Sequence, residues 1–580
     1  MEWLSCSEEN EGVSYGGNSS SSSASRIPRI GLFAVDCVHT MQGAVAITDP
    51  MNAGQRPSIM LVGYVSDEYY AAVADVLVEF RSGNGARLST RSSASGAVLA
   101  DLAPGGYEVC LNKPGFGSKR VQSSVGKGAP IHFRLLSDHL LGYAWPKWCR
   151  AGETVQFRVH AVEPYKLGLW RYGYRKEFIR NLGWFDNHGP RASMQTIPDG
   201  HFVEQGVHWD HGFGVHRQFL IAPERTGLYY FHARTESGAF FSFPLVVAPN
   251  QPGERIAVLA STNTWNAYNP FGGRSNYILA AQMIDEPIVN AKSDLPRYKL
   301  SDYGEWKSGR EFQPLSFDRP EPYNHVPEDV QCSDPIEGRQ ACHLAPAEWR
   351  LLAWLEQQGH AYDLYADYQL HAGLLDLSKY RVLVLAVHPE YWSGEMYRTV
   401  KSWVFERGGR LFYLGGNGLN CKILFLDGGS SMRCLNAWPA GYESRFHYQE
   451  ESEANLLGVV FSDAGAMTAA PYEVVAADHW VFAGTGLRPG DRFGTKTLHE
   501  RYAGGASGHE TDKISPSAPQ NIVLLAKGQN PDDGGAHLVH FETARGGAVF
   551  SAGSIMYPSA LLCDEMVSQI TANVLQRFLQ

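Results

Sequence analysis

The feature that most constrains this fold is a run of apolar residues that ends abruptly in charged and aromatic side chains. Residues Val382 to Ala386 are all apolar, and His388, Glu390 and two aromatic rings follow within six positions. An apolar run without polar alternation is typical of a strand that is covered on both faces in a parallel sheet. Because ligands and chemistry collect at the carboxyl ends of such strands, the sequence predicts that His388 and Glu390 lie at a functional edge.

The chain around this strand alternates predicted strands with predicted helices. One helix is expected at Pro346 to Gln358, where Gly359 can end it, and another begins at Ser393 as its N-cap. Further strands are predicted by the apolar runs at 255–261, 362–365 and 411–414. Such alternation with short links predicts an α/β domain with a mainly parallel sheet over residues 251–580.

The first half of the chain has a different pattern. Residues 1–30 include a Gly- and Ser-rich run and are expected to be a disordered tail. Short β-type runs broken by turn residues then predict a β-rich domain at 31–135 and a β-sandwich at 136–250. Within the first of these, residues 78–120 resemble the small carboxypeptidase-regulatory-like β-domain.

Charge and composition exclude several classes of protein. The net charge of -10 comes from 50 basic and 60 acidic residues spread along the chain, so no basic stripe indicates nucleic-acid binding. No stretch approaches the roughly 18 apolar residues that span a bilayer, and the acidic N-terminus lacks the apolar core of a signal peptide. The nine cysteines include no CxxC pair, which indicates reduced thiols. We therefore expect a cytoplasmic protein that binds neither nucleic acid nor membrane.

The strand ends lack a catalytic nucleophile. Neither a Gly-x-Ser-x-Gly nor a Gly-x-Cys-x-Gly turn follows any predicted strand, so covalent catalysis has no attacking atom. The carboxylate and imidazole of HPEYWS suit metal binding or general acid/base work instead.

Several further motifs occur along the chain in the same order as in a known family. They are NTWNAYNPFGGRSNY, SFDRP, AEWRLLAWLE, HPEYWS, GGNGLN, SGHETDK and VFSAGS. In this order the chain from about residue 250 to 580 resembles the catalytic domain of N,N-dimethylformamidase large subunits. Residues 142–159 also resemble the β-domain before it. The resemblance implies a glutamine-amidotransferase-like α/β domain that hydrolyses a small N-substituted amide.

The resemblance also implies a mononuclear Fe(III) held by two tyrosines and one glutamate. Tyr268 matches the first tyrosine and Glu390 the glutamate. We assign the second tyrosine to Tyr323, with Tyr303 as the alternative, because Glu321 stands where relatives place a tyrosine after Arg-Pro. Phenolate and carboxylate are hard oxygen ligands, which favour Fe(III) over Zn(II). The structural alternatives are a packed ring for each tyrosine and a helix-capping role for Glu390.

Three residues are candidates for catalysis beside the metal. His388 and Glu510 can move the protons that amide cleavage requires, and Asn417 can donate to the oxyanion or orient the substrate. A rival metal cluster, His208, His211 and His216, has loose spacing and is more simply a polar loop.

Two functions from different classes remain open at this point. One is an iron-dependent amidohydrolase; the other is a non-catalytic or carbohydrate-directed binding protein with a degenerate α/β domain. For the enzyme, the resemblance implies a small-molecule amide substrate and a homo-oligomer, with a small partner subunit as an additional component.

Overall fold

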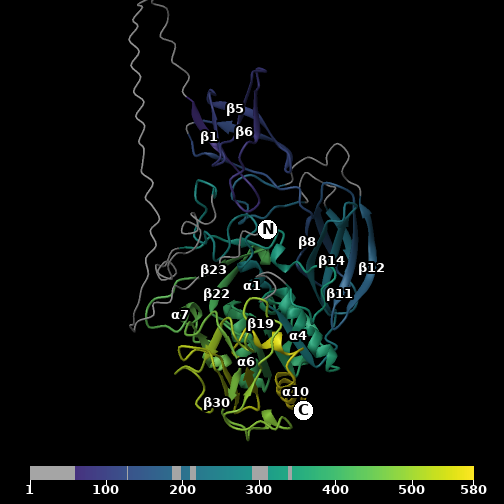
Figure 1. The fold of residues 1–580 in the computed structure, drawn as a ribbon, viewed down its shortest axis with the longest axis vertical. Helices are drawn as coiled ribbons and strands as arrows, with labels where there is room; N and C mark the ends of the chain where they lie inside the picture. The colour runs from purple at the N-terminus through teal and green to yellow at the C-terminus, as the bar shows by residue number, and fades with distance from the viewer. Residues whose placement is uncertain (1–58, 127, 186–196, 210–216, 290–310, 337–342) are drawn as a thin grey trace, which may run out of the picture. The chain divides into compact units, whose positions relative to one another are not determined.

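The computed structural model in Figure 1 describes residues 59–126, 128–185, 197–209, 217–289, 311–336 and 343–580. The predicted tail at 1–30, Tyr303, His211 and His216 lie outside these ranges. Residues 59–580 form one compact unit, so the predicted domain boundaries within it stay predictions.

Two small sheets build the β-rich region at the start of the described chain. One sheet has the order β4-β1-β7 and the other β3-β2-β5-β6. Their strands are β1 (Met60–Ser66), β2 (Leu77–Ser82), β3 (Arg87–Arg91), β4 (Ala97–Ala100), β5 (Gly105–Lys113), β6 (Gly117–Val125) and β7 (Ile131–Arg134). Alternate side chains such as Val78, Phe80, Val109 and Leu111 form a shared apolar core, which is the pattern of strands with one buried face.

A second pair of sheets follows and confirms the β-rich character of the first half. A three-stranded sheet has the order β13-β10-β8, and a five-stranded sheet has the order β12-β11-β14-β15-β9. Their strands are β8 (Leu141–Trp145), β9 (Trp148–Arg150), β10 (Thr154–His160), β11 (Tyr165–Tyr172), β12 (Lys176–Phe185), β13 (Arg217–Ile221), β14 (Gly227–Thr235) and β15 (Phe240–Ala248). Phe157 of one sheet packs against Phe231 of the other with ring centroids 5.8 Å apart.

The second half is organised around a nine-stranded mixed sheet with the order β18-β16-β19-β21-β32-β31-β30-β26-β27. Its first five strands run parallel: β18 (Asp363–Ala366), β16 (Ile256–Ala260), β19 (Val382–Val387), β21 (Arg410–Gly415) and β32 (Ala548–Ser551). Its last four are antiparallel: β31 (His537–Glu542), β30 (Val523–Gly528), β26 (Tyr472–Val474) and β27 (Arg492–Phe493). The prediction of a mainly parallel sheet therefore holds for half of it. The other half of the sheet is antiparallel, contrary to the prediction. Strand β31 is joined to β32 by a short connection, and so short a connection can join only antiparallel strands.

Strand β19 is buried on both faces, as the apolar run predicted. Val382 and Val384 belong to the core that contains α4 (Ala345–Gln357) and α10 (Glu565–Leu579). Leu383 and Leu385 belong to the core on the other side, with α6 (Gly394–Arg407). Helices thus pack on both faces of the sheet at β19 and exclude water from this strand.

The predicted helix after β19 is confirmed in detail. The Ser393 hydroxyl accepts a hydrogen bond from the Met396 amide at 3.2 Å, as an N-cap does, and Gly408 ends α6 with φ +76°.

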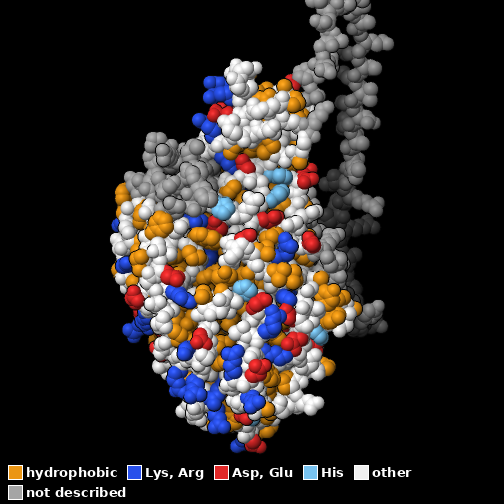
Figure 2. All heavy atoms as spheres, turned by 180° about the vertical axis from the view of Figure 1, so that it is seen from behind, with side chains coloured by type: hydrophobic (Ala, Val, Ile, Leu, Met, Phe, Trp, Pro, Cys, Tyr) orange, Lys and Arg blue, Asp and Glu red, His pale blue; other side chains and the backbone are white. Residues whose placement is uncertain are grey.

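On the face of the molecule in Figure 2, basic and acidic side chains are interspersed. No helix among the described residues is long and apolar enough to span a membrane. The described cysteines are free thiols, as expected.

Candidate active site

The carboxyl ends of three neighbouring strands carry residues that the sequence singled out. Strand β16 leads through α1 (Thr262–Ala267) to Tyr268, β19 leads to His388 and Glu390, and β21 leads to Asn417. The backbone is strained at two of these ends, because Val387 has φ +52° and Asn417 has φ +50°. A β-branched residue at positive φ is a conformational outlier, and such outliers cluster at functional sites.

Four of the predicted residues lie within direct reach of one another. His388 Nε2 lies 3.3 Å from Glu390 Oε2 and 3.2 Å from Glu510 Oε2. The Asn417 side-chain amide donates to the same oxygen of Glu510 at 2.8 Å. His388 and Glu390 each expose only 1% of their surface. The structure therefore assembles an imidazole between two carboxylates in a buried environment.

Two tyrosines converge on the Glu390 carboxylate. The Tyr268 hydroxyl donates to Glu390 Oε2 at 3.3 Å, and the Tyr277 hydroxyl donates to the same oxygen at 2.8 Å. The two rings lie 4.3 Å apart, centroid to centroid. Burial, followed by the charge of Glu390, raises the pKa of both phenols well above the usual value. Both hydroxyls are therefore neutral donors in this arrangement.

Tyr277 is the residue that sequence reasoning missed. Tyr323 lies in the short 3-10 helix Pro322–Asn324, and its ring packs against the core that contains Tyr268. The signal for Tyr277 was present, since it is the last residue of the NTWNAYNPFGGRSNY motif. The assignment of the second ligand to Tyr323 or Tyr303 stays a prediction.

Arg445 is a second residue that the sequence did not reveal. It lies at the start of α7 (Arg445–Gln449), and its Nη2 donates to Glu390 Oε1 at 2.6 Å. Burial alone would raise the pKa of Glu390, but the hydrogen bond from His388 and the charge of Arg445 hold that pKa at about 2. Burial alone would lower the pKa of His388, but its bonds to Glu390 and Glu510 raise it to about 9.

The donor atoms fit a hard metal ion. Oxygen Oε2 of Glu390 faces both tyrosine hydroxyls, while Oε1 is held by Arg445. Among the described residues, no three His, Cys, Asp or Glu side chains are grouped so that they could hold a metal ion. A metal at this edge would be held by phenolate and carboxylate oxygens, which suit Fe(III) better than Zn(II).

A set of hydrogen bonds holds the loop that carries Asn417. The Asn417 backbone amide donates to Asp512 Oδ1, the Gly418 amide donates to the Tyr413 hydroxyl, and that hydroxyl donates to Asp512 Oδ2, each at 2.7 Å. We call Tyr413 and Asp512 the loop latch. It joins the GGNGLN loop to the SGHETDK segment and so fixes Asn417 against Glu510.

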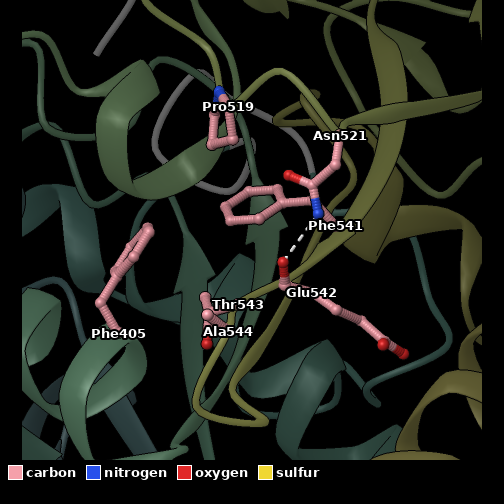
Figure 3. Close-up of a pocket in the computed structure, with 7 residues that line it drawn as sticks. All are labelled: Phe405, Pro519, Asn521, Phe541, Glu542, Thr543 and Ala544. Atoms are coloured by element: carbon pink, nitrogen blue, oxygen red, sulfur yellow. Dashed lines mark hydrogen bonds between the residues drawn. The ribbon is translucent and has the colours of Figure 1, made fainter.

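His208 contacts a residue outside this set, and a surface cavity lies at the other end of the sheet. His208, the described member of the predicted rival cluster, places Nδ1 2.9 Å from Asp318 Oδ2. A surface cavity of about 560 Å³ in Figure 3 is lined by Phe405, Pro519, Asn521, Phe541, Glu542, Thr543 and Ala544. Glu542 pairs with Ala548, at the amino end of β32, so this cavity is at the opposite end of the sheet from His388.

Comparison with known proteins agrees with the motifs. The family model described as "N,N-dimethylformamidase beta subunit-like, C-terminal" matches residues 170–569. An N,N-dimethylformamidase beta subunit from Paracoccus aminophilus is 27% identical over 385 residues, which cover 56% of this chain and 49% of the relative. A protein of the same name from Alcaligenes sp is 26% identical over 465 residues, which cover 65% of this chain and 58% of the relative.

The chain thus spans about half the length of the curated relatives that it matches. Among solved structures, the major pilin subunit BcpA of Bacillus cereus aligns with 34% of this chain and 71% of its own, at 11% identity and a TM-score of 0.13. That score is too low to support a statement about fold.

Proposed function

Since the chain belongs to the N,N-dimethylformamidase beta subunit-like family, we propose that it hydrolyses a small N-substituted amide with the help of a mononuclear Fe(III). One observation carries this proposal: the hydroxyls of Tyr268 and Tyr277 and the imidazole of His388 all lie within 3.3 Å of Glu390 Oε2.

Tyr268, Glu390 and a second tyrosine would hold the iron. The geometry favours Tyr277 for the second position. When bound, Fe(III) would polarise the amide carbonyl and make water more acidic without changing its own redox state. The guanidinium of Arg445 keeps Glu390 ionised and turns Oε2 toward the two phenols.

His388 and Glu510 would move the protons of the reaction. An amide nitrogen leaves poorly unless it is protonated, so a proton must pass from the attacking water to that nitrogen. His388 contacts Glu510 at 3.2 Å, which allows this transfer between them. Asn417 donates to Glu510 Oε2 and would orient that carboxylate, whereas the role that we expected from the sequence was to donate to the oxyanion or to orient the substrate.

The remaining parts of the proposal rest on the resemblance and on the names of the relatives. Both relatives are named as subunits, so we propose that this chain assembles with further copies of itself, with or without a small partner subunit. The glutamine-amidotransferase-like arrangement of the mixed sheet and a cytoplasmic location also stay proposals.

The test begins with the metal and the colour of the purified protein. We expect about one iron per chain and visible absorption from phenolate-to-Fe(III) charge transfer, together with amine release from N,N-dimethylformamide or another small amide. Glu390→Gln should lose iron, colour and activity, whereas the matched control Glu395→Gln, on the exposed side of α6, should keep all three. A folded wild-type protein that stays iron-free and colourless after growth with iron would refute the proposal.

Two further variants separate the roles. Glu510→Gln should retain iron and colour but lower kcat by about 100-fold or more, the usual range for loss of an acid/base group. Tyr277→Phe and Tyr323→Phe should differ in visible absorption, because loss of the tyrosine that binds iron shifts or removes the charge-transfer band.

A further inference from the structure

A row of buried imidazoles leads away from the proposed active site. The His343 ring lies 4.5 Å from the Tyr268 ring and 5.5 Å from the His388 ring, centroid to centroid. The His509 ring lies 5.4 Å from that of His343, and the His499 ring lies 5.0 Å from that of His509. The four histidines expose at most 5% of their surface. Of these four histidines, the proposed mechanism uses only His388.

The hydrogen bonds along this row fix where the protons lie. The Tyr502 backbone amide donates to His499 Nδ1 at 3.1 Å, so this nitrogen carries no hydrogen. In a neutral imidazole the other nitrogen must then be the donor. His499 Nε2 lies 3.1 Å from His509 Nδ1, and therefore donates to it. Because His509 Nδ1 accepts, the hydrogen of His509 resides on Nε2.

The imidazoles of His499 and His509 are both neutral. Burial, followed by the charges of Arg350 and Arg501, lowers the pKa of His499 to about 3. Burial, followed by the neighbouring imidazoles of His499 and His343, lowers the pKa of His509 well below the usual value. Two adjacent imidazoles in a buried site cannot both be charged, since the desolvation and repulsion would be too costly.

The backbone holds His509 in place. Its φ is +66°, an uncommon value for a residue other than glycine. Its amide donates to the Thr468 carbonyl at 2.9 Å, and its carbonyl accepts from the Met467 amide at 2.7 Å. In the described part of the chain the His509 ring makes its hydrogen bond through Nδ1, to His499 Nε2. The Nε2–H on the other side of the same rigidly held ring is a donor suited to an acceptor on a ligand.

We propose that His509 is a further catalytic residue, whose Nε2–H donates a hydrogen bond to the carbonyl oxygen of the bound amide while His499 fixes its tautomer. This inference rests on the proposed amide function and deepens it. A neutral imidazole polarises a carbonyl without transferring its proton, and it gains strength as negative charge develops on the oxygen. Removing one such donor from an active site lowers kcat by about 100-fold to 1,000-fold.

The first test reads the tautomer directly and needs no catalysis. We would label the histidines of the full chain with ¹⁵N, record long-range ¹H–¹⁵N spectra, and assign His509 by comparison with His509→Gln. The expected result is a neutral ring with its proton on Nε2 from pH 6 to pH 8, and a mixture of tautomers in His499→Phe. A charged His509, or one protonated on Nδ1, would overturn the proposal.

The second test asks whether the donor meets an amide. On titration with N-methylacetamide, the Nε2 proton of His509 should shift in wild type whether or not the protein hydrolyses amides. A proton that stays unmoved at saturating amide would overturn the ligand role even if the tautomer is as expected. This readout separates the failure of the inference from the failure of the proposed function.

Kinetics provide a third comparison where hydrolysis is observed. His509→Phe should lower kcat by about 100-fold with little change in KM, and His509→Gln, which restores an N–H donor, should recover at least about tenfold of that loss. His540→Phe is the matched control, since His540 is also buried but lies beside His479 and Trp480. Equal losses in His509→Phe and His509→Gln would contradict a donor role.

Discussion

We predict that replacing Tyr413 by phenylalanine opens the GGNGLN loop locally while leaving the sheet intact. The lost hydroxyl is half of the loop latch: it accepts from the Gly418 amide and donates to Asp512 Oδ2, each at 2.7 Å. The phenylalanine ring fills the same space in the core next to β21, so packing changes little. The effect should therefore come from hydrogen bonding alone.

The size of the effect follows from two buried groups that lose their partner. Leaving a buried donor or acceptor unsatisfied costs about 1–3 kcal/mol each, so the Gly418 amide and the Asp512 carboxylate together cost about 2–6 kcal/mol. Each 1.4 kcal/mol is a tenfold change in an equilibrium constant, so local opening should become at least about 30 times more frequent.

Hydrogen exchange followed by mass spectrometry measures this opening. Peptides that contain residues 415–420 should exchange at least about 30 times faster in Tyr413→Phe. The matched control is Tyr107→Phe, which removes an exposed hydroxyl bonded to the Ala103 carbonyl and should leave these peptides unchanged. Equal exchange in wild type and Tyr413→Phe would refute the reasoning that the latch holds Asn417.

Two other perturbations test the fold around the site. Ser393→Ala removes the N-cap of α6 and should lower the free energy of unfolding, measured in denaturant, by about 1 kcal/mol. The control Ser402→Ala, inside the same helix, should lower it clearly less. Equal losses in the two variants would contradict the capping role of Ser393. Burial raises the pKa of Glu453 to about 8, so the folded chain holds this proton more tightly than the unfolded chain. The stability that this proton contributes is fully present below the unfolded pKa and is lost as the pH rises toward 8. Between pH 5 and pH 8 the unfolding free energy of wild type should therefore fall with pH more steeply than that of Glu453→Gln, by up to about 1.4 kcal/mol per pH unit. Equal slopes for the two proteins in urea titrations would contradict this.

The sequence predicted those parts of the fold that depend on local pattern. The apolar run of β19 has no polar position that could face water, so its burial on both faces could be read directly. The cap at Ser393 and the end at Gly408 are signals within a few residues of each helix terminus. His388 and Glu390 could be placed at the sheet edge because they directly follow the strand.

The sequence could not predict contacts that depend on the path of a loop. Tyr277 reaches Glu390 only because the chain after Tyr268 turns back at Gly272 and Gly273, both at positive φ. Arg445 arrives from a separate helix whose position is set by packing. The antiparallel half of the sheet also escaped prediction, and two of its strands, β26 and β27, are only three and two residues long.

The position of β32 has a consequence for how this chain folds. This strand follows β21 only after a long stretch of sequence, yet it pairs between β21 and β31, so that Leu411 lies opposite Val549. Until β32 has been synthesised, the edge of β21 that it covers has no neighbour from the sheet, and an open edge of this kind is a template for aggregation. Contacts between residues so distant in sequence also form slowly. The strand ends that carry the proposed active site are therefore completed late, and the nascent chain depends on protection of that edge until then.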